Sequence, residues 1–118
     1  VASTLHSGVP LHISIFDNAI FFIIPSYSKK AASPVKQGEI MAMGIPLICN
    51  SGVGDTDSIV IKYKAGTVIN ELNDETYRAN FIQKEMFDSQ GIIDGAKAYF
   101  SLEEGLNQYE WIYEKVLE

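Results

Sequence analysis

The alternation of apolar and polar segments along the chain predicts three short strands separated by helices. Residues 19–24 form a continuous apolar run rich in β-branched and aromatic side chains, which is typical of a strand buried on both faces. Shorter apolar runs at residues 47–49 and 67–69 predict two further strands. Buried strands of this kind belong to parallel sheets joined by right-handed crossovers. We therefore expect an α/β fold, a Rossmann-like parallel sheet flanked by helices.

Capping signals predict where the connecting helices begin and end. Ser33 and Pro34 supply an N-cap and a first-turn proline for the helix after the first strand, and Gly44 provides the left-handed residue that ends it. A glycine turn at residues 51–54 leads into a second helix, which we expect Gly66 to stop. Both helices are thus connected to the strands by short loops.

The two ends of the chain have different patterns. Residues 1–18 predict one more strand at the start and a short helix near residues 11–17. From residue 73 onward the pattern is helical throughout. One amphipathic face there is marked by Tyr77, Phe81, Ile82 and Met86. We expect this all-helical C-terminal segment to form an outer covering of a single domain over residues 1–118.

The last helix has its own start signal. Ser101 and Glu104 form a capping box, and apolar residues then recur every three or four positions. These positions are Leu102, Leu106, Tyr109, Tyr113 and Val116.

Composition restricts the classes of function. The chain has 118 residues and a net charge of −6, which argues against a nucleic-acid surface. No acidic residue lies between Asp17 and Glu39, and Lys29, Lys30 and Lys36 all fall inside that window. The one locally basic region therefore coincides with the start of the first predicted helix.

Several kinds of site are disfavoured by the residues present. His6 and His12 have no neighbouring metal-type ligands, so we expect no metal site. The single Cys49 sits in an apolar run, where it fits as a small buried hydrophobe and weakly favours a reducing compartment. Gly52 and Gly54 begin like a dinucleotide-binding fingerprint, but Asp57 stands where the third glycine is needed, and no phosphate-loop lysine follows.

The start of the first predicted helix offers an anion site. In an open parallel sheet, ligands bind beyond the carboxyl ends of the strands, where loops lead into helix N-termini. Two such loops occur here, at residues 25–33 and 50–55. Pro34 has no N–H group, so Val35, Lys36 and Gln37 are the expected donors to a phosphate.

Glu39 lies about a turn and a half inside the same helix. Its carboxylate can accept two hydrogen bonds from a vicinal diol, as acidic residues do with nucleotide ribose. An alternative is that Glu39 pairs with Lys36 on a solvated helix face, which contributes about 0.2 to 0.5 kcal/mol. Spacing alone leaves both interpretations open.

The segment SPVKQGEIMAMGIPLICNSGVGD, residues 33–55, resembles the donor-binding motif of group 1 nucleotide-sugar-dependent glycosyltransferases. The resemblance extends over about residues 9–69 and becomes vaguer after residue 73. It implies the C-terminal, donor-binding half of a two-domain GT-B fold. The resemblance further implies that Glu39 binds the donor ribose. Donor pyrophosphate and sugar are then expected at Ser33, Pro34, Val35, Lys36, Lys29 and Lys30, with Gly52 and Gly54 in a turn nearby.

Two positions depart from the family pattern. Many members have a glutamate that contacts the transferred sugar where this chain has Ala31, and a subgroup with the Ser-Pro-x-Lys form also lacks it. That departure leaves no candidate for the contact. An acidic residue often begins the helix after the glycine turn where Ser58 stands here, and Asp55 or Asp57 is expected to cap instead.

The resemblance implies a hexosyltransferase-like enzyme that transfers a sugar from a UDP- or GDP-type donor to an acceptor hydroxyl, with retention and without an obligatory metal or other cofactor. A nucleotide-sugar epimerase of the same fold and a non-catalytic nucleotide- or partner-binding domain are the alternatives. Because the chain begins with Val1 and shows no signal pattern, we expect a fragment that is inactive alone.

The expected partners are the nucleotide sugar, the missing N-terminal domain and an acceptor glycan, lipid or small molecule. Nucleic acid is not among them. No apolar run reaches the roughly 20 residues of a membrane span. The family-level expectation is a cytoplasmic enzyme of polysaccharide assembly, with peripheral association at the inner face of a membrane.

Overall fold

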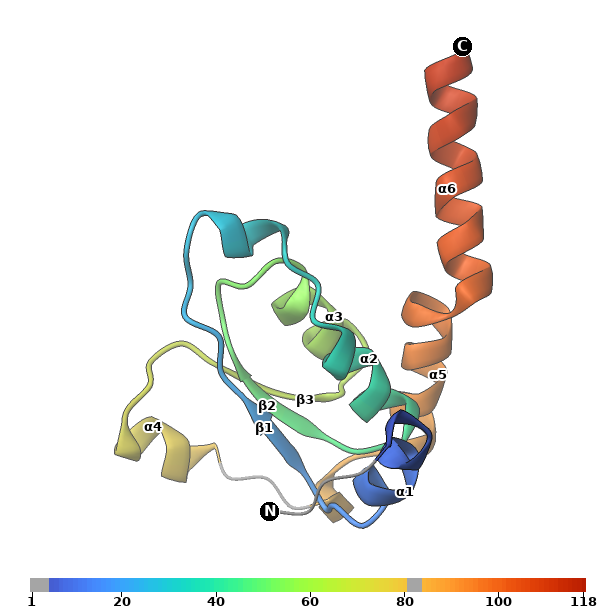
Figure 1. The fold of residues 1–118 in the computed structure, drawn as a ribbon. Helices are drawn as coiled ribbons and strands as arrows, with labels where there is room; N and C mark the ends of the chain where they lie inside the picture. The colour runs from blue at the N-terminus through green and yellow to red at the C-terminus, as the bar shows by residue number, and fades with distance from the viewer. Residues whose placement is uncertain (1–4, 81–83) are drawn as a thin grey trace.

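A computed structural model describes residues 5–80 and 84–118 of the chain (Figure 1). Its centre is a parallel sheet of three strands in the order β1-β2-β3, formed by Ala19–Phe21, Leu47–Asn50 and Gly66–Ile69. Both strand pairs are parallel, with Leu47 beside Ala19 on one side and beside Gly66 on the other. Helices flank the sheet. The predicted α/β, Rossmann-like architecture is confirmed.

The middle strand β2 is buried along its whole length. Leu47 and Cys49 join the main core between the sheet and the helices. Ile48 belongs to a smaller cluster with Ile69 and the half-buried Phe87. Since successive side chains of a strand point to opposite faces, β2 is covered on both sides, as its apolar sequence predicts.

The prediction for the first strand was wrong in length and burial. β1 spans only three residues, and it is an edge strand paired with β2 alone. Exposed fractions are 43% at Ile20, 43% at Phe22 and 84% at Ile24. After β1 the chain leaves the sheet, and the Asn50 side chain replaces strand pairing: Ile23 N–H donates to Asn50 Oδ1 at 2.8 Å, and Asn50 Nδ2 donates to the Ile23 carbonyl at 2.7 Å.

The helix between β1 and β2, α2, spans Val35–Ala42. Gly44 follows it at φ +69°, so the predicted left-handed end is confirmed. The predicted N-cap was wrong, because Pro34 occupies the cap position and no side chain caps the helix there. The Ser33 hydroxyl donates instead to Asp55, which lies 22 residues away in sequence.

The helix between β2 and β3, α3, spans Thr56–Lys62. It ends before Gly66, and the left-handed residue after it is Lys64 at φ +50°. The predicted stop at Gly66 was therefore wrong. Gly66 serves the sheet, because a Cβ at this position would lie 1.8 Å from the carbonyl oxygen of Leu47 on the neighbouring strand.

The N-terminal region begins with a short 3-10 helix, η1, at His6–Gly8, followed by α1 at Val9–Ile13. The helix near residues 11–17 is thus present but begins earlier and is shorter than predicted. Residues 5–18 contain no strand, and residues 1–4 lie outside the described part of the chain.

The C-terminal region is helical, as predicted, in all its elements from residue 74 onward that the structure describes. These elements are α4 (Asp74–Ala79), η3 (Lys84–Met86), α5 (Ser89–Phe100) and α6 (Leu102–Leu117). Ser101 caps α6 by accepting a hydrogen bond from the Glu104 N–H at 3.2 Å, so the start signal is confirmed. None of the described helices is long and apolar enough to cross a membrane.

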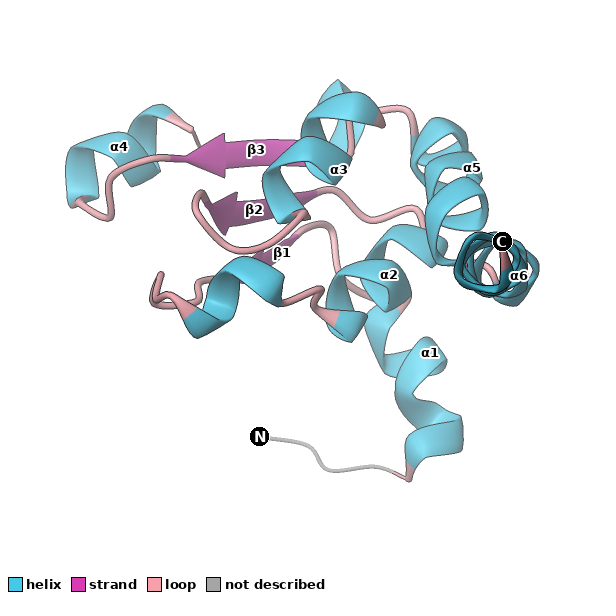
Figure 2. Ribbon diagram, turned by 90° about the horizontal axis from the view of Figure 1, so that it is seen from above, coloured by secondary structure: helices cyan, strands magenta, loops and turns pink. Residues whose placement is uncertain are grey.

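Only part of this segment forms the predicted covering. α5 packs on α2 and buries Ile92 and Ala96 in the main core. α4 and α6 bury no residue, and they lie at opposite ends of the molecule, with α6 extending away from the sheet (Figures 1 and 2). Tyr77 and Met86 are exposed, whereas Phe81 and Ile82 of the predicted amphipathic face lie outside the described residues.

Replacing Gly66 with alanine tests the close contact between β2 and β3. We expect Gly66→Ala to lower the free energy of unfolding by about 3 kcal/mol, because its Cβ collides with the Leu47 carbonyl. Gly105→Ala is the matched control, since a Cβ there meets nothing within 4 Å in α6, and it should raise stability by up to about 1 kcal/mol. Urea denaturation of both variants measures the difference. Equal effects of the two changes would contradict this account.

Candidate functional site

The two loops at the carboxyl ends of β1 and β2 meet at one place. The first carries the 3-10 helix η2, Ser28–Ala31, and leads into α2, whereas the second is the glycine turn before α3 (Figure 1). Gly54 has φ +49°, and a Cβ there would lie 1.7 Å from the carbonyl oxygen of Ala32. The second loop therefore packs directly against the first, and together they form one edge of the molecule.

The start of α2 provides fewer backbone donors than predicted. The N–H groups of Val35 and Lys36 lie in the first turn and have no partner within the helix. Gln37 was also expected as a donor, but its N–H donates to the Pro34 carbonyl at 3.1 Å. Its side chain is buried against α3, where Nε2 donates to the Thr56 carbonyl at 3.4 Å. Two first-turn amides therefore remain for an anion.

The glycine turn does not offer the free N–H groups that the sequence suggested. The Gly52 N–H donates to Asp57 Oδ2 at 3.3 Å, and Asp55 lies at the N-cap position of α3 without capping it through its side chain. Two carboxylates beside the turn disfavour a second anion there. Gly52 and Gly54 thus have a structural role, because both adopt positive φ angles of +84° and +49°.

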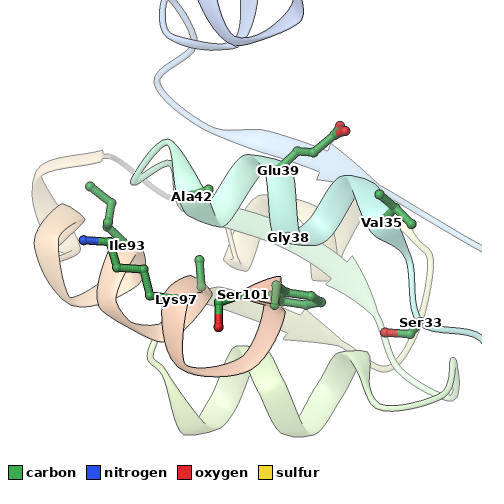
Figure 3. A pocket seen from close by; sticks show the side chains of 10 residues that line it. Ser33, Val35, Gly38, Glu39, Ala42, Ile93, Lys97 and Ser101 are labelled. Atoms are coloured by element: carbon green, nitrogen blue, oxygen red, sulfur yellow. The ribbon is translucent and has the colours of Figure 1, made fainter. Parts of the chain in front are cut away.

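Glu39 is a half-buried residue of α2. Its side chain points away from α5 (Figure 3). Hollows lie on both sides of it. One, of about 520 Å³, runs between α2 and α5, and the other, of about 390 Å³, lies between α1, β1 and α2. Among the described residues, Glu39 makes no hydrogen bond or ion pair, so its predicted alternative partner, Lys36, does not hold it. Its carboxylate is available to a ligand.

The lysines surround the start of α2 without being paired. Lys29 and Lys30 are exposed on η2, and Lys36 shares the hollow of about 390 Å³ with Glu39. In the described part of the chain the one ion pair joins Lys115 to Glu118, at 3.5 Å. The three lysines are therefore free to raise the local positive potential near the two amides of α2.

Sequence reasoning missed a cluster of three side chains below the first loop. Asp55 Oδ2 accepts hydrogen bonds from Tyr99 at 2.5 Å and from Ser33 at 3.3 Å. The hydrogen bond to Asp55, with burial and the carboxylate charge adding to it, raises the pKa of Tyr99 to about 12. No local signal links Tyr99 to this site, since it lies 44 residues after Asp55 on α5.

The structure supports neither a cysteine nucleophile nor a metal site among the described residues. Burial raises the pKa of the Cys49 thiol to about 12, and the charge of Asp57 adds to the effect, so this cysteine is a poor nucleophile. No group of three or more His, Cys, Asp or Glu side chains among the described residues is arranged to hold a metal ion.

Comparisons of the chain with protein-family models, with curated proteins and with solved structures gave no match.

The Tyr99–Asp55 bond can be tested by titration. We expect Tyr99 to ionise near pH 12, above the range of about pH 10 for an unperturbed tyrosine. A raised pKa means that folding favours the protonated form, so the bond contributes stability below about pH 10 and this contribution is lost as pH rises to about 12. Absorbance at alkaline pH should show the late-titrating group in the native chain. Its persistence in Tyr99→Phe would contradict the assignment, and Asp55→Asn should move it toward the ordinary range.

Proposed function

We propose that this domain binds the nucleoside-diphosphate sugar donor of a glycosyltransferase. The observation that supports the proposal is the position of Glu39, an unpartnered carboxylate one turn beyond two free first-turn amides. A carboxylate that accepts two hydrogen bonds suits the 2′ and 3′ hydroxyls of ribose. The combination of amide donors and a diol acceptor on one short helix matches a nucleoside diphosphate better than phosphate or sugar alone.

Charge around α2 is consistent with a diphosphate at its start. The first-turn N–H groups of Val35 and Lys36 lie at the positive end of the helix dipole, and Lys29 and Lys30 stand on the loop before it. When the bond to the sugar breaks, negative charge develops on the diphosphate leaving group. Fixed amides and cations stabilise such charge in the transition state. The proposed reaction is transfer of the glycosyl unit to an acceptor hydroxyl, which requires no cofactor.

The exposed apolar side chains of α6 support the proposal that a second domain belongs to the active enzyme. Along its 16 residues, α6 leaves all its large apolar side chains exposed, including Tyr109, Trp111 and Tyr113. An apolar surface of this kind is typical of an interface. We propose that α6 contacts the N-terminal, acceptor-binding domain, which leaves the isolated chain able to bind the donor and unable to transfer it.

Removing the Glu39 carboxylate is the direct test of the proposed function. In the two-domain enzyme we expect Glu39→Ala to lower kcat/KM for glycosyl transfer by about 10²-fold, or roughly 2.7 kcal/mol of transition-state stabilisation. The matched control is Glu75→Ala, since Glu75 is an exposed carboxylate on α4 and lines neither of the two hollows beside Glu39. A loss of less than threefold in Glu39→Ala, or an equal loss in the control, counts against the proposal.

The proposed contact of α6 can be followed with the single tryptophan. Trp111 is 58% exposed, so its emission in the isolated chain should be that of a solvated indole and should be quenched readily by acrylamide. In the two-domain enzyme we expect a shift to shorter wavelength and at least twofold weaker quenching. Identical spectra of the two proteins would show that α6 stays uncovered.

A further inference from the structure

Ser33 lies at one end of the hollow of about 520 Å³ between α2 and α5 (Figure 3). It is exposed, whereas Asp55 below it is half-buried and has one oxygen, Oδ1, shielded from solvent. The other oxygen, Oδ2, accepts the hydrogen bonds from Ser33 and Tyr99. The outermost polar atom of this cluster on the side of the hollow is therefore Ser33 Oγ.

The cluster fixes the direction of the hydrogen bonds that Ser33 can make. An ionised carboxylate only accepts hydrogen bonds, so the single hydroxyl proton of Ser33 is directed to Asp55. Tyr99 keeps its own proton to high pH and donates it to the same oxygen, so neither partner supplies a proton to Ser33. Ser33 Oγ consequently presents lone pairs to the hollow, and it acts as an acceptor toward a ligand.

This polarity separates two kinds of ligand group. A phosphate oxygen at Ser33 would meet an acceptor without a proton to give, with a carboxylate directly behind it, and both effects disfavour an anion. A neutral hydroxyl group can donate to Ser33 Oγ, and the charge of Asp55 strengthens that bond. The hollow therefore favours a hydroxyl-bearing group at Ser33, and the anion belongs at the amides of α2.

The remaining walls of the hollow suit a sugar ring as well. Phe100 and Ile93 add apolar surface to the lining, and Glu39, Lys97 and Ser101 add polar groups. Gly38 lets the Phe100 ring approach α2 closely, because a Cβ there would lie 2.9 Å from Phe100 Cγ. A pyranose has both features that this lining matches, an apolar ring face and hydroxyl donors at its edge.

On the basis of the proposed function, we propose that Ser33, oriented by Asp55 and Tyr99, accepts a hydrogen bond from a hydroxyl of the donor's glycosyl unit and selects the nucleotide sugar over the bare nucleoside diphosphate. In this arrangement the carboxylate of Asp55, from the loop after β2, acts on the sugar through Ser33. Ser33 is thus a specificity-determining residue, and Asp55 and Tyr99 are positioning residues.

Calorimetric titration of the 118-residue chain with UDP, GDP, UDP-glucose and GDP-mannose tests this role. For the nucleotide sugar that the native chain binds best, we expect Ser33→Ala to weaken binding about tenfold, which corresponds to 1.4 kcal/mol. Binding of the matching nucleoside diphosphate should change less than twofold. Ser33→Thr should restore the selectivity, since threonine keeps the hydroxyl, and Tyr99→Phe should lower it partly. Thermal unfolding of each variant checks that the fold is retained.

Three results would overturn the proposal in distinguishable ways. If the native chain binds UDP or GDP and loses this binding in Glu39→Ala, yet Ser33→Ala keeps full selectivity, the role of Ser33 is wrong and the proposed function stands. If Ser33→Ala weakens nucleotide and nucleotide sugar equally, Ser33 has a structural role only. If the native chain binds none of the four compounds, the proposed function fails and the role of Ser33 fails with it.

Discussion

The arrangement of the two loops at the candidate site depends on one close approach of backbone to backbone, between Gly54 and the Ala32 carbonyl. The absence of a side chain at Gly54 lets the turn after β2 touch the loop before α2, and this contact brings Asp55 within hydrogen-bonding distance of Ser33. The first loop also passes close to Gly52 of the same turn, where a Cβ would lie 3.5 Å from Pro25 Cβ. Gly54, which the sequence places in a glycine turn like those that bind phosphate, thus serves to let the two loops pack closely.

Local signals predicted the elements whose causes are local. The buried strand β2, the left-handed end at Gly44 and the cap at Ser101 depend on a few adjacent residues, and all three are present. Ser33 was misassigned as a cap because its partner, Asp55, becomes a neighbour only in the folded chain. Tyr99 was missed for the same reason, because only folding brings it next to Asp55. β1 was overestimated because an apolar run indicates burial in general, whereas an edge strand is buried only where another element covers it.

The charge pattern and the fold give two parts of the molecule different surface properties. Lys29, Lys30 and Lys36 lie around the start of α2, whereas α6 has four glutamates together with an uncovered apolar surface. These properties suit different contacts. The basic edge suits a small anionic ligand, and the long acidic and aromatic helix suits a macromolecular surface. The proposed donor-binding role, with a second domain against α6, would use both surfaces, and they lie on different elements.

The most direct test of the account is a crystal structure of this chain with UDP or GDP. The account predicts that the diphosphate lies on the N–H groups of Val35 and Lys36 and that both ribose hydroxyls donate to Glu39. The space beside Ser33, where the account places the sugar of the full donor, would be left open to solvent. A nucleotide bound elsewhere, or a ribose held by another residue while Glu39 faces solvent, would contradict the central claim that α2 is the donor-binding helix.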